Sequence, residues 1–150
     1  MTLVSSVHPR SQGYAPHMRP RMRLIAAWVL VGIYASAIFA WSSVSKPPLM
    51  PQWDVRHLDK LYHAIEYAVL AFLLMRALRM TCPTHSMTQL ILWGVVLTAL
   101  YGLSDELHQA LTPDRTMSVY DLVADAVGAS MVGLVWPRIQ GRWPVISDST

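Results

Sequence analysis

The run from Leu24 to Ser45 constrains this chain more than any other feature. It spans 22 residues and contains no charged side chain. At a rise of about 1.5 Å per residue, about 20 apolar residues in a helix cross the hydrocarbon core of a bilayer. The rest of the composition agrees, because only 14% of the 150 residues are charged, whereas a soluble domain carries about 25%. The sequence therefore predicts an integral membrane protein, and its single cysteine excludes a disulfide scaffold.

Three further apolar segments follow the first one. They are Leu61–Leu78, the part of the uncharged stretch Met80–Ser104 that begins near Gln89, and Val119–Trp136, which we expect Pro137 to stop. Each is long enough for a membrane-spanning helix. The predicted fold is therefore all-α, an integral membrane bundle of four transmembrane helices.

The segments outside these helices are short. Residues 1–22 are predicted to form a flexible basic cytoplasmic tail, residues 23–138 the transmembrane domain, and residues 139–150 a short C-terminal tail. An alternative takes Leu24–Tyr34 as the apolar region of a signal peptide with a cleavage site near Ala37. The 23 residues before Leu24 are long for such a peptide, so an uncleaved first helix is favoured.

The basic residues next to each segment predict the orientation. Lys and Arg are retained on the cytoplasmic side during insertion, so we expect both termini to be cytoplasmic. That arrangement collects eight arginines against Asp148 on the inner side, a balance of +7. The outer side then holds four basic and eight acidic residues, a balance of −4, and the two sum to the net charge of +3. The basic excess is thus an orientation signal, and we expect no nucleic-acid partner.

The predicted second helix begins with a polar block. Asp59, His63 and Glu66 follow a spacing of i, i+4 and i+7, which places them on one face, with Lys60 and Tyr67 beside them. Glu66 lies about 10 Å deeper than Asp59 by helical rise. An ionisable group at that depth is costly unless it faces protein or water, so we expect His63 and Glu66 to point into the bundle and to have partners.

A second polar block ends the predicted third helix. Asp105 shares a helical face with His108 and Gln109, whereas Glu106 is turned about 100° away. Arg115 follows in the connecting loop. The block adds candidate site residues at the same predicted end of the bundle.

The start of the predicted fourth helix carries a third group. Ser118 and Asp121 have the spacing of a capping box with Asp in place of Glu, in which each residue would cap the backbone N–H of the other. Asp121, Asp125 and Gly128 repeat the i, i+4, i+7 stripe, which Gly133 continues. We expect the two glycines to let another helix approach closely.

With these blocks the chain resembles the VanZ-like family of small bacterial membrane proteins, named for an accessory determinant of resistance to the glycopeptide antibiotic teicoplanin. The resemblance spans about residues 25 to 136 and rests on a D-E-x-x-Q block, then P-x-R, then D-x-x-x-[ND]-x-x-G. The matching residues are Asp59, Lys60, His63, Tyr67, Leu70, Asp105, Glu106, Gln109, Pro113, Arg115, Asp121 and Gly128. The sequence departs from the pattern at Asp125, where the family pattern has Asn. The resemblance implies a multi-helix protein of the bacterial cytoplasmic membrane, associated with the cell envelope.

Three kinds of function fit the polar blocks better than proton or ion transport, for which Glu66 is the only mid-depth carboxylate and no polar group on the inner side completes a path. A binding site for an envelope lipid, a lipid-linked precursor or a teicoplanin-like lipoglycopeptide joins them best to the resemblance, with Arg115 clamping a phosphate or carboxylate and Lys60 adding a point charge. A structural network that ties helix ends together needs no ligand. An enzyme, with His63 and Glu66 as an acid/base pair or with carboxylates around a divalent cation, is the third.

The sequence favours a protein that is not an enzyme. It contains no H-E-x-x-H, P-loop or nucleophile-elbow motif. We expect no resident cofactor or metal, and the lipid bilayer as the first partner. The oligomeric state stays open, because Gly128 and Gly133 would serve packing between chains as well as within one.

Overall fold

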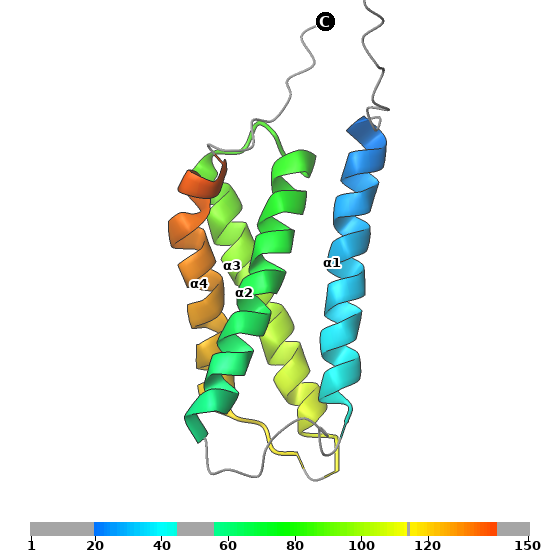
Figure 1. The fold of residues 1–150 in the computed structure, drawn as a ribbon, viewed down its shortest axis with the longest axis vertical. Coiled ribbons are helices and arrows are strands. Elements are labelled where there is room, and N and C mark those ends of the chain that lie inside the picture. The colour runs from blue at the N-terminus through cyan, green and yellow to red at the C-terminus, as the bar shows by residue number, and fades with distance from the viewer. Residues whose placement is uncertain (1–19, 45–55, 114, 141–150) are drawn as a thin grey trace, which may run out of the picture.

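The structure, a computed structural model, describes residues 20–44, 56–113 and 115–140. These residues form four antiparallel helices: α1 (Pro20–Ser42), α2 (Arg56–Thr81), α3 (Met87–Gln109) and α4 (Val119–Gln140) (Figure 1). All four are long and apolar enough to cross a membrane. The described part of the chain has no strand, so the predicted all-α fold of four membrane-spanning helices is confirmed at this level. The predicted tails, residues 1–22 and 139–150, lie almost entirely outside the described residues.

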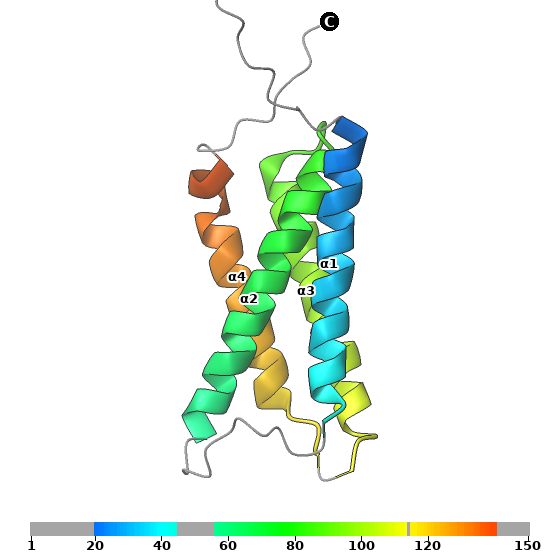
Figure 2. The same ribbon diagram turned by 45° about the vertical axis from the view of Figure 1, so that its right-hand side comes forward.

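Helix α2 is the centre of the bundle. It packs against α1, α3 and α4, whereas α1 and α4 do not contact each other in the described parts of the chain. The views in Figures 1 and 2 place α1 on the opposite side of α2 from α4. The closest association is between α2 and α4, the two helices that carry the first and third polar blocks.

The two ends of the bundle differ in charge. We call the end where α1 and α3 finish and α2 and α4 begin the acidic end, and the opposite end the basic end (Figure 1). All six acidic residues with described side chains lie in the half of the bundle at the acidic end, with Lys60 and Arg115. The other described basic side chains lie at the basic end and are Arg21, Arg23, Arg76, Arg79 and Arg138. The charge separation expected from the sequence is therefore built into the bundle.

Two helix ends differ from their predicted form. Helix α3 begins with a capping box that was not predicted, in which Gln89 N–H donates to Ser86 Oγ and Ser86 N–H donates to Gln89 Oε1. Pro137 does not stop α4, which continues to Gln140. A proline in a helix removes the one N–H that would bond the carbonyl four residues earlier. Here that carbonyl belongs to Gly133, so the helix loses one bond in its last turns and still completes the turn.

Close packing joins the helices along their length. One buried cluster near the acidic half contains Ile38, Tyr67, Leu70 and Leu74, and a second contains Ala71, Met75, Ala129 and Trp136. Because lipid tails are as apolar as leucine, such contacts stabilise a membrane bundle through fit between surfaces. Small residues supply that fit, and a Cβ on Gly133 would lie 2.8 Å from the Ile91 side chain. Gly133 therefore lies where α3 approaches α4 closely, as the predicted packing role requires.

Candidate functional site

A pocket opens at the acidic end among α1, α2, α3 and the loop before α4. Its lining residues are Trp41, Ser42, Asp59, Tyr62, His63, Glu66, Asp105, Gln109 and Arg115. We call it the acidic-end pocket. Its volume is about 30 Å³, which is room for about two water molecules or one small polar group.

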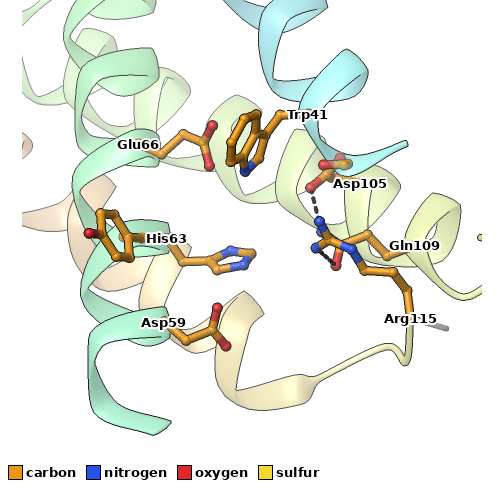
Figure 3. Close-up of a pocket in the computed structure, with 9 residues that line it drawn as sticks. Trp41, Asp59, His63, Glu66, Asp105, Gln109 and Arg115 are labelled. Atoms are coloured by element: carbon orange, nitrogen blue, oxygen red, sulfur yellow. Dashed lines mark hydrogen bonds between the residues drawn. The ribbon is translucent and has the colours of Figure 1, made fainter. Parts of the chain in front are cut away.

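Helix α2 supplies one wall of this pocket. Asp59, His63 and Glu66 project from successive turns toward the same space (Figure 3). This is the stripe predicted from the i, i+4, i+7 spacing. Glu66 therefore faces a polar pocket and not lipid, which is the placement that a deep carboxylate requires.

The opposite wall is a chain of hydrogen bonds from the loop into α3. Arg115 Nη1 donates to Gln109 Oε1 at 3.2 Å, and Gln109 Nε2 donates to Asp105 Oδ2 at 2.9 Å (Figure 3). Arg115 Nε and Nη2 both donate to the carbonyl of Val44, at 3.3 and 3.2 Å, just beyond α1. Within the described residues, three of the five guanidinium N–H groups are thus used and two have no partner.

Behind the pocket, His63 pairs with α4. Its Nδ1 lies 3.0 Å from Asp125 Oδ1, and the Asp125 side chain is fully buried. The ring of Tyr67 lies nearly parallel to the His63 ring, with centroids 6.3 Å apart. The imidazole is therefore held on two sides, by Asp125 and by the ring of Tyr67.

Glycines make this approach of helices feasible. A Cβ on Gly128 would fall on the backbone carbonyl of Ala64, so α4 contacts the backbone of α2 one residue from His63. A Cβ on Gly102 would lie 2.7 Å from Asp125 Oδ2. A larger side chain at Gly128 would push α4 away from α2, and one at Gly102 would displace the Asp125 side chain.

The capping box expected between Ser118 and Asp121 forms only in part. Asp121 N–H does donate to Ser118 Oγ, at 3.3 Å. The prediction of a reciprocal bond from Ser118 N–H to the Asp121 side chain is wrong. Ser118 N–H donates to Glu106 Oε2 of α3 instead, at 2.7 Å. The shorter Asp121 side chain pairs instead with Lys60 of α2.

Lys60 joins three polar groups at the rim. Its ammonium contacts Asp121 Oδ1, lies 3.1 Å from Asp59 Oδ2, and lies 3.5 Å from Ser118 Oγ. Like Arg115, it is therefore engaged within the protein. These contacts support the hypothesis of a structural network that ties the helix ends together.

His108 takes a separate position. It stacks on Phe39 of α1, with ring centroids 4.2 Å apart, and its Nε2 lies 3.0 Å from Ser43 Oγ. Its neighbour Gln109 lines the pocket and His108 does not. His108 therefore belongs to the polar network at the acidic end but ties α3 to α1.

Several pocket residues were not foreseen. Trp41, Ser42 and Tyr62 line the pocket, and the carbonyl of Val44 anchors Arg115. Nothing in the sequence around Trp41 or Ser42 marks them, because an aromatic or serine at a helix end is common in membrane proteins. Tyr62 sits next to His63 and could have been included from that position.

The buried carboxylates at the acidic end are incompletely paired. Glu106 Oε1 and Asp125 Oδ2 are buried and have no hydrogen-bond partner within the described residues. Glu106 and Asp125 are both fully buried. Buried polar atoms normally have partners, so these oxygens mark a place where another group could bind.

Three of these residues also have the spacing of metal ligands. His63, Glu106 and Asp121 each offer a ligand atom, and the three atoms lie within 4.8 Å of one another. Imidazole and carboxylate oxygens are common ligands of divalent cations. The site can therefore act through hydrogen bonds, through charge, or through a bound cation.

Fold and site together define a class: a small protein with four helices of membrane-spanning length and a polar pocket at one end of the bundle. The family model VanZ/LLP1 matches residues 1–140. The chain therefore belongs to the VanZ/LLP1 family, and the resemblance drawn from the polar blocks is confirmed. No curated protein and no solved structure matches it.

Proposed function

We propose that the protein is a multi-pass protein of the bacterial cytoplasmic membrane that recognises the polar end of an amphiphilic cell-envelope molecule in its acidic-end pocket. The candidate ligands are an envelope lipid, a lipid-linked precursor and a lipid-tailed glycopeptide of the teicoplanin type. Both termini are cytoplasmic in this proposal, so the pocket opens on the outer side. The charge separation between the two ends supports that orientation, because arginines gather at the basic end.

The observation that carries the proposal is the surplus of carboxylates around the pocket. Asp59, Glu66 and Asp105 line it, and Arg115, the one permanent cation among its described lining residues, is already bonded to Val44 and Gln109. Ionised carboxylates only accept hydrogen bonds. The matching ligand group therefore carries N–H or O–H donors, as amino groups and sugar hydroxyls do.

The size and surroundings of the pocket fit an amphiphile. A volume of about 30 Å³ admits one amine or hydroxyl edge and not a whole head group. Trp41 and Tyr62 are exposed at its mouth, and such rings suit the boundary between head groups and acyl chains. The remainder of the ligand would lie across these rings with its acyl chain beside the apolar helix faces.

Ligand binding can be tested with two related probes. Teicoplanin and the same glycopeptide without its acyl chain are titrated against the full chain in nanodiscs. We expect the acylated probe to bind and the deacylated one to bind at least about tenfold more weakly, since each buried CH₂ contributes about 0.8 kcal/mol. Glu66→Gln and Asp105→Asn should each weaken binding of the acylated probe by about tenfold, the loss of one hydrogen bond to a charged group.

His108→Gln is the matched control, because His108 lies at the same end of α3 but outside the pocket. It should leave binding unchanged. Equal affinity of wild type, Glu66→Gln and Asp105→Asn for the acylated probe would contradict the proposal and would favour a purely structural network.

The orientation has its own test. A single cysteine at position 112, introduced as Thr112→Cys with Cys82→Ser, is labelled in intact cells with a membrane-impermeant maleimide. The proposed orientation predicts labelling from outside. Labelling only after the cells are opened would contradict it.

A further inference from the structure

We infer that His63, Glu106 and Asp121 form a binding site for one divalent transition-metal ion of the Zn²⁺ or Mn²⁺ type, behind the acidic-end pocket. We call these three residues the ligand triad. Their ligand atoms come from α2, α3 and α4 and lie within 4.8 Å of one another. One ion could therefore be bound by all three helices after small side-chain movements.

The first argument is the unused oxygen of Glu106. Its Oε2 accepts the Ser118 N–H at 2.7 Å, while its Oε1 is buried and has no partner within the described residues. The whole side chain is 0% exposed, so bulk water does not satisfy that oxygen. A buried oxygen without a partner costs free energy, and an ion bound by Glu106 would remove that cost. An exposed acidic cluster has no such cost, because water binds its oxygens.

The second argument is the support of His63. A histidine that binds a metal commonly donates its other ring N–H to a carboxylate, which fixes the ring and its tautomer. His63 Nδ1 lies 3.0 Å from Asp125 Oδ1, which leaves Nε2 as the nitrogen with a free lone pair. Asp125 thus acts as a positioning residue for the ligand His63.

The third argument is the local charge. When metal ligation keeps them ionised, Glu106, Asp121 and Asp125 bring three negative charges, and Lys60 is the one permanent cation in contact with them among the described residues. With a neutral His63 this group carries a net charge of −2. One divalent cation balances it.

The ligand set decides the kind of ion. Mg²⁺ and Ca²⁺ prefer oxygen ligands alone, whereas imidazole together with carboxylates suits Zn²⁺, Mn²⁺ and related ions. Three protein ligands also leave a coordination position open, as in metal sites that bind a further molecule. His63 is the residue shared by the ligand triad and the acidic-end pocket, so a bound ion would lie at the back of the pocket. This inference departs from the sequence-based expectation of no resident metal.

The test measures metal directly, on the full chain in detergent. The protein is stripped with EDTA, dialysed, and then incubated with Zn²⁺, Mn²⁺ or Mg²⁺, and bound metal is measured by mass spectrometry of the elements. We expect about one Zn²⁺ or Mn²⁺ per chain and little Mg²⁺. The melting temperature should rise by about 5 °C when an ion that binds only the folded state is present at about 100 times its Kd.

Variants locate the ion. Glu106→Gln keeps an oxygen that can accept the Ser118 N–H but should lose the metal. Asp125→Ala should weaken metal binding by about 10- to 100-fold through His63, and Asp125→Asn by less, because its amide oxygen still accepts the ring N–H. Glu66→Gln is the matched control, since Glu66 lines the pocket outside the ligand triad, and it should retain one metal per chain.

Three outcomes would overturn the inference. One is wild-type protein that binds no stoichiometric Zn²⁺ or Mn²⁺ and melts at the same temperature with and without EDTA. Another is Glu66→Gln losing as much metal as Glu106→Gln, and the third is Mg²⁺ binding as tightly as Zn²⁺ and Mn²⁺. No lipid or glycopeptide is present in these measurements, so their failure is separate from failure of the proposed ligand recognition.

Discussion

The acidic and basic ends of the bundle hold the same helices together by different means. At the acidic end, polar side chains bridge α1 to α3 and α2 to α4, as in the contacts of His108 with Phe39 and of His63 with Asp125. At the basic end the described residues show one hydrogen bond between side chains of different helices, from Trp28 Nε1 to Thr81 Oγ1 at 2.9 Å. Buried apolar side chains such as Trp136 supply the rest of the packing there.

This difference shows that the bundle does not need carboxylates in order to pack. The basic half associates through small and apolar residues, which is the usual means in membranes. Among the described residues, the acidic half carries six carboxylates at a cost in desolvation, and buried oxygens of Glu106 and Asp125 have no partner there. Retaining them is therefore better explained by a ligand than by architecture.

Gly128 gives the largest expected effect. Gly128→Ala places a methyl group on the Ala64 carbonyl and forces α4 away from α2. We expect the free energy of unfolding to fall by about 3 kcal/mol, because overpacking typically costs about 1–3 kcal/mol and the backbone is the part of a structure that moves least easily. Gly32→Ala on α1 is the control, because nothing lies within 4 Å of its added Cβ, and alanine there should be neutral or stabilising. Reversible unfolding in mixed micelles measures both. Equal stability of the two variants would show that α2 and α4 do not approach as described.

Two helix caps compare the ends directly. Glu106→Ala removes the carboxylate that accepts the Ser118 N–H at the start of α4. We expect this to lower the free energy of unfolding by about 2 kcal/mol. Ser86→Ala removes the side-chain cap of α3 at the basic end and should lower the free energy of unfolding by about 1 kcal/mol. Hydrogen exchange at the first turns of α4 and α3 measures the two losses. A larger effect at Ser86 would reverse the comparison.

The tie between α1 and α3 is expected to be weaker. Tyr101 Oη donates to the carbonyl of Ala35 at 2.6 Å, so Tyr101→Phe should cost about 1 kcal/mol, the net value of one hydrogen bond. Ser130→Ala removes a bond within α4 alone and should change stability by no more than about 0.5 kcal/mol. If the melting temperatures of the two variants agree, the Tyr101 bond contributes nothing to the packing of α1.

Trp28→Phe at the basic end should have the smallest effect. It removes the bond to Thr81 while keeping an aromatic ring, and the Trp28 side chain is exposed. We expect a change of about 0.5 kcal/mol or less, as for most surface substitutions. A loss as large as that of Tyr101→Phe would mean that polar ties matter equally at both ends.

Features carried by a single segment could be predicted from the sequence. The four helices follow from apolar runs, and the shared face of Asp59, His63 and Glu66 follows from helical spacing. The prediction that Pro137 ends α4 was wrong, because the loss of one hydrogen bond near a helix end does not unwind the final turn.

Contacts between segments could not be predicted in this way. His63 and Asp125 are 62 residues apart, and they meet because Gly128 sets the depth at which α4 lies on α2. In the same way Glu106 replaces Asp121 as the partner of the Ser118 N–H, since only the fold brings α3 to the start of α4. Spacing alone shows which residues share a face, but not which face of another helix lies opposite.

Ligand recognition by the acidic-end pocket is tested most directly by identifying the molecules that stay bound to the protein when it is extracted from its native membrane. Wild type and Asp105→Asn are released from native membranes and analysed by native mass spectrometry, with His108→Gln as the control. We expect wild type and His108→Gln to retain an amphiphilic molecule bearing amino or hydroxyl groups, and Asp105→Asn to have lost most of it. The same adducts in the same proportions on all three proteins would contradict the claim that the acidic-end pocket recognises a ligand.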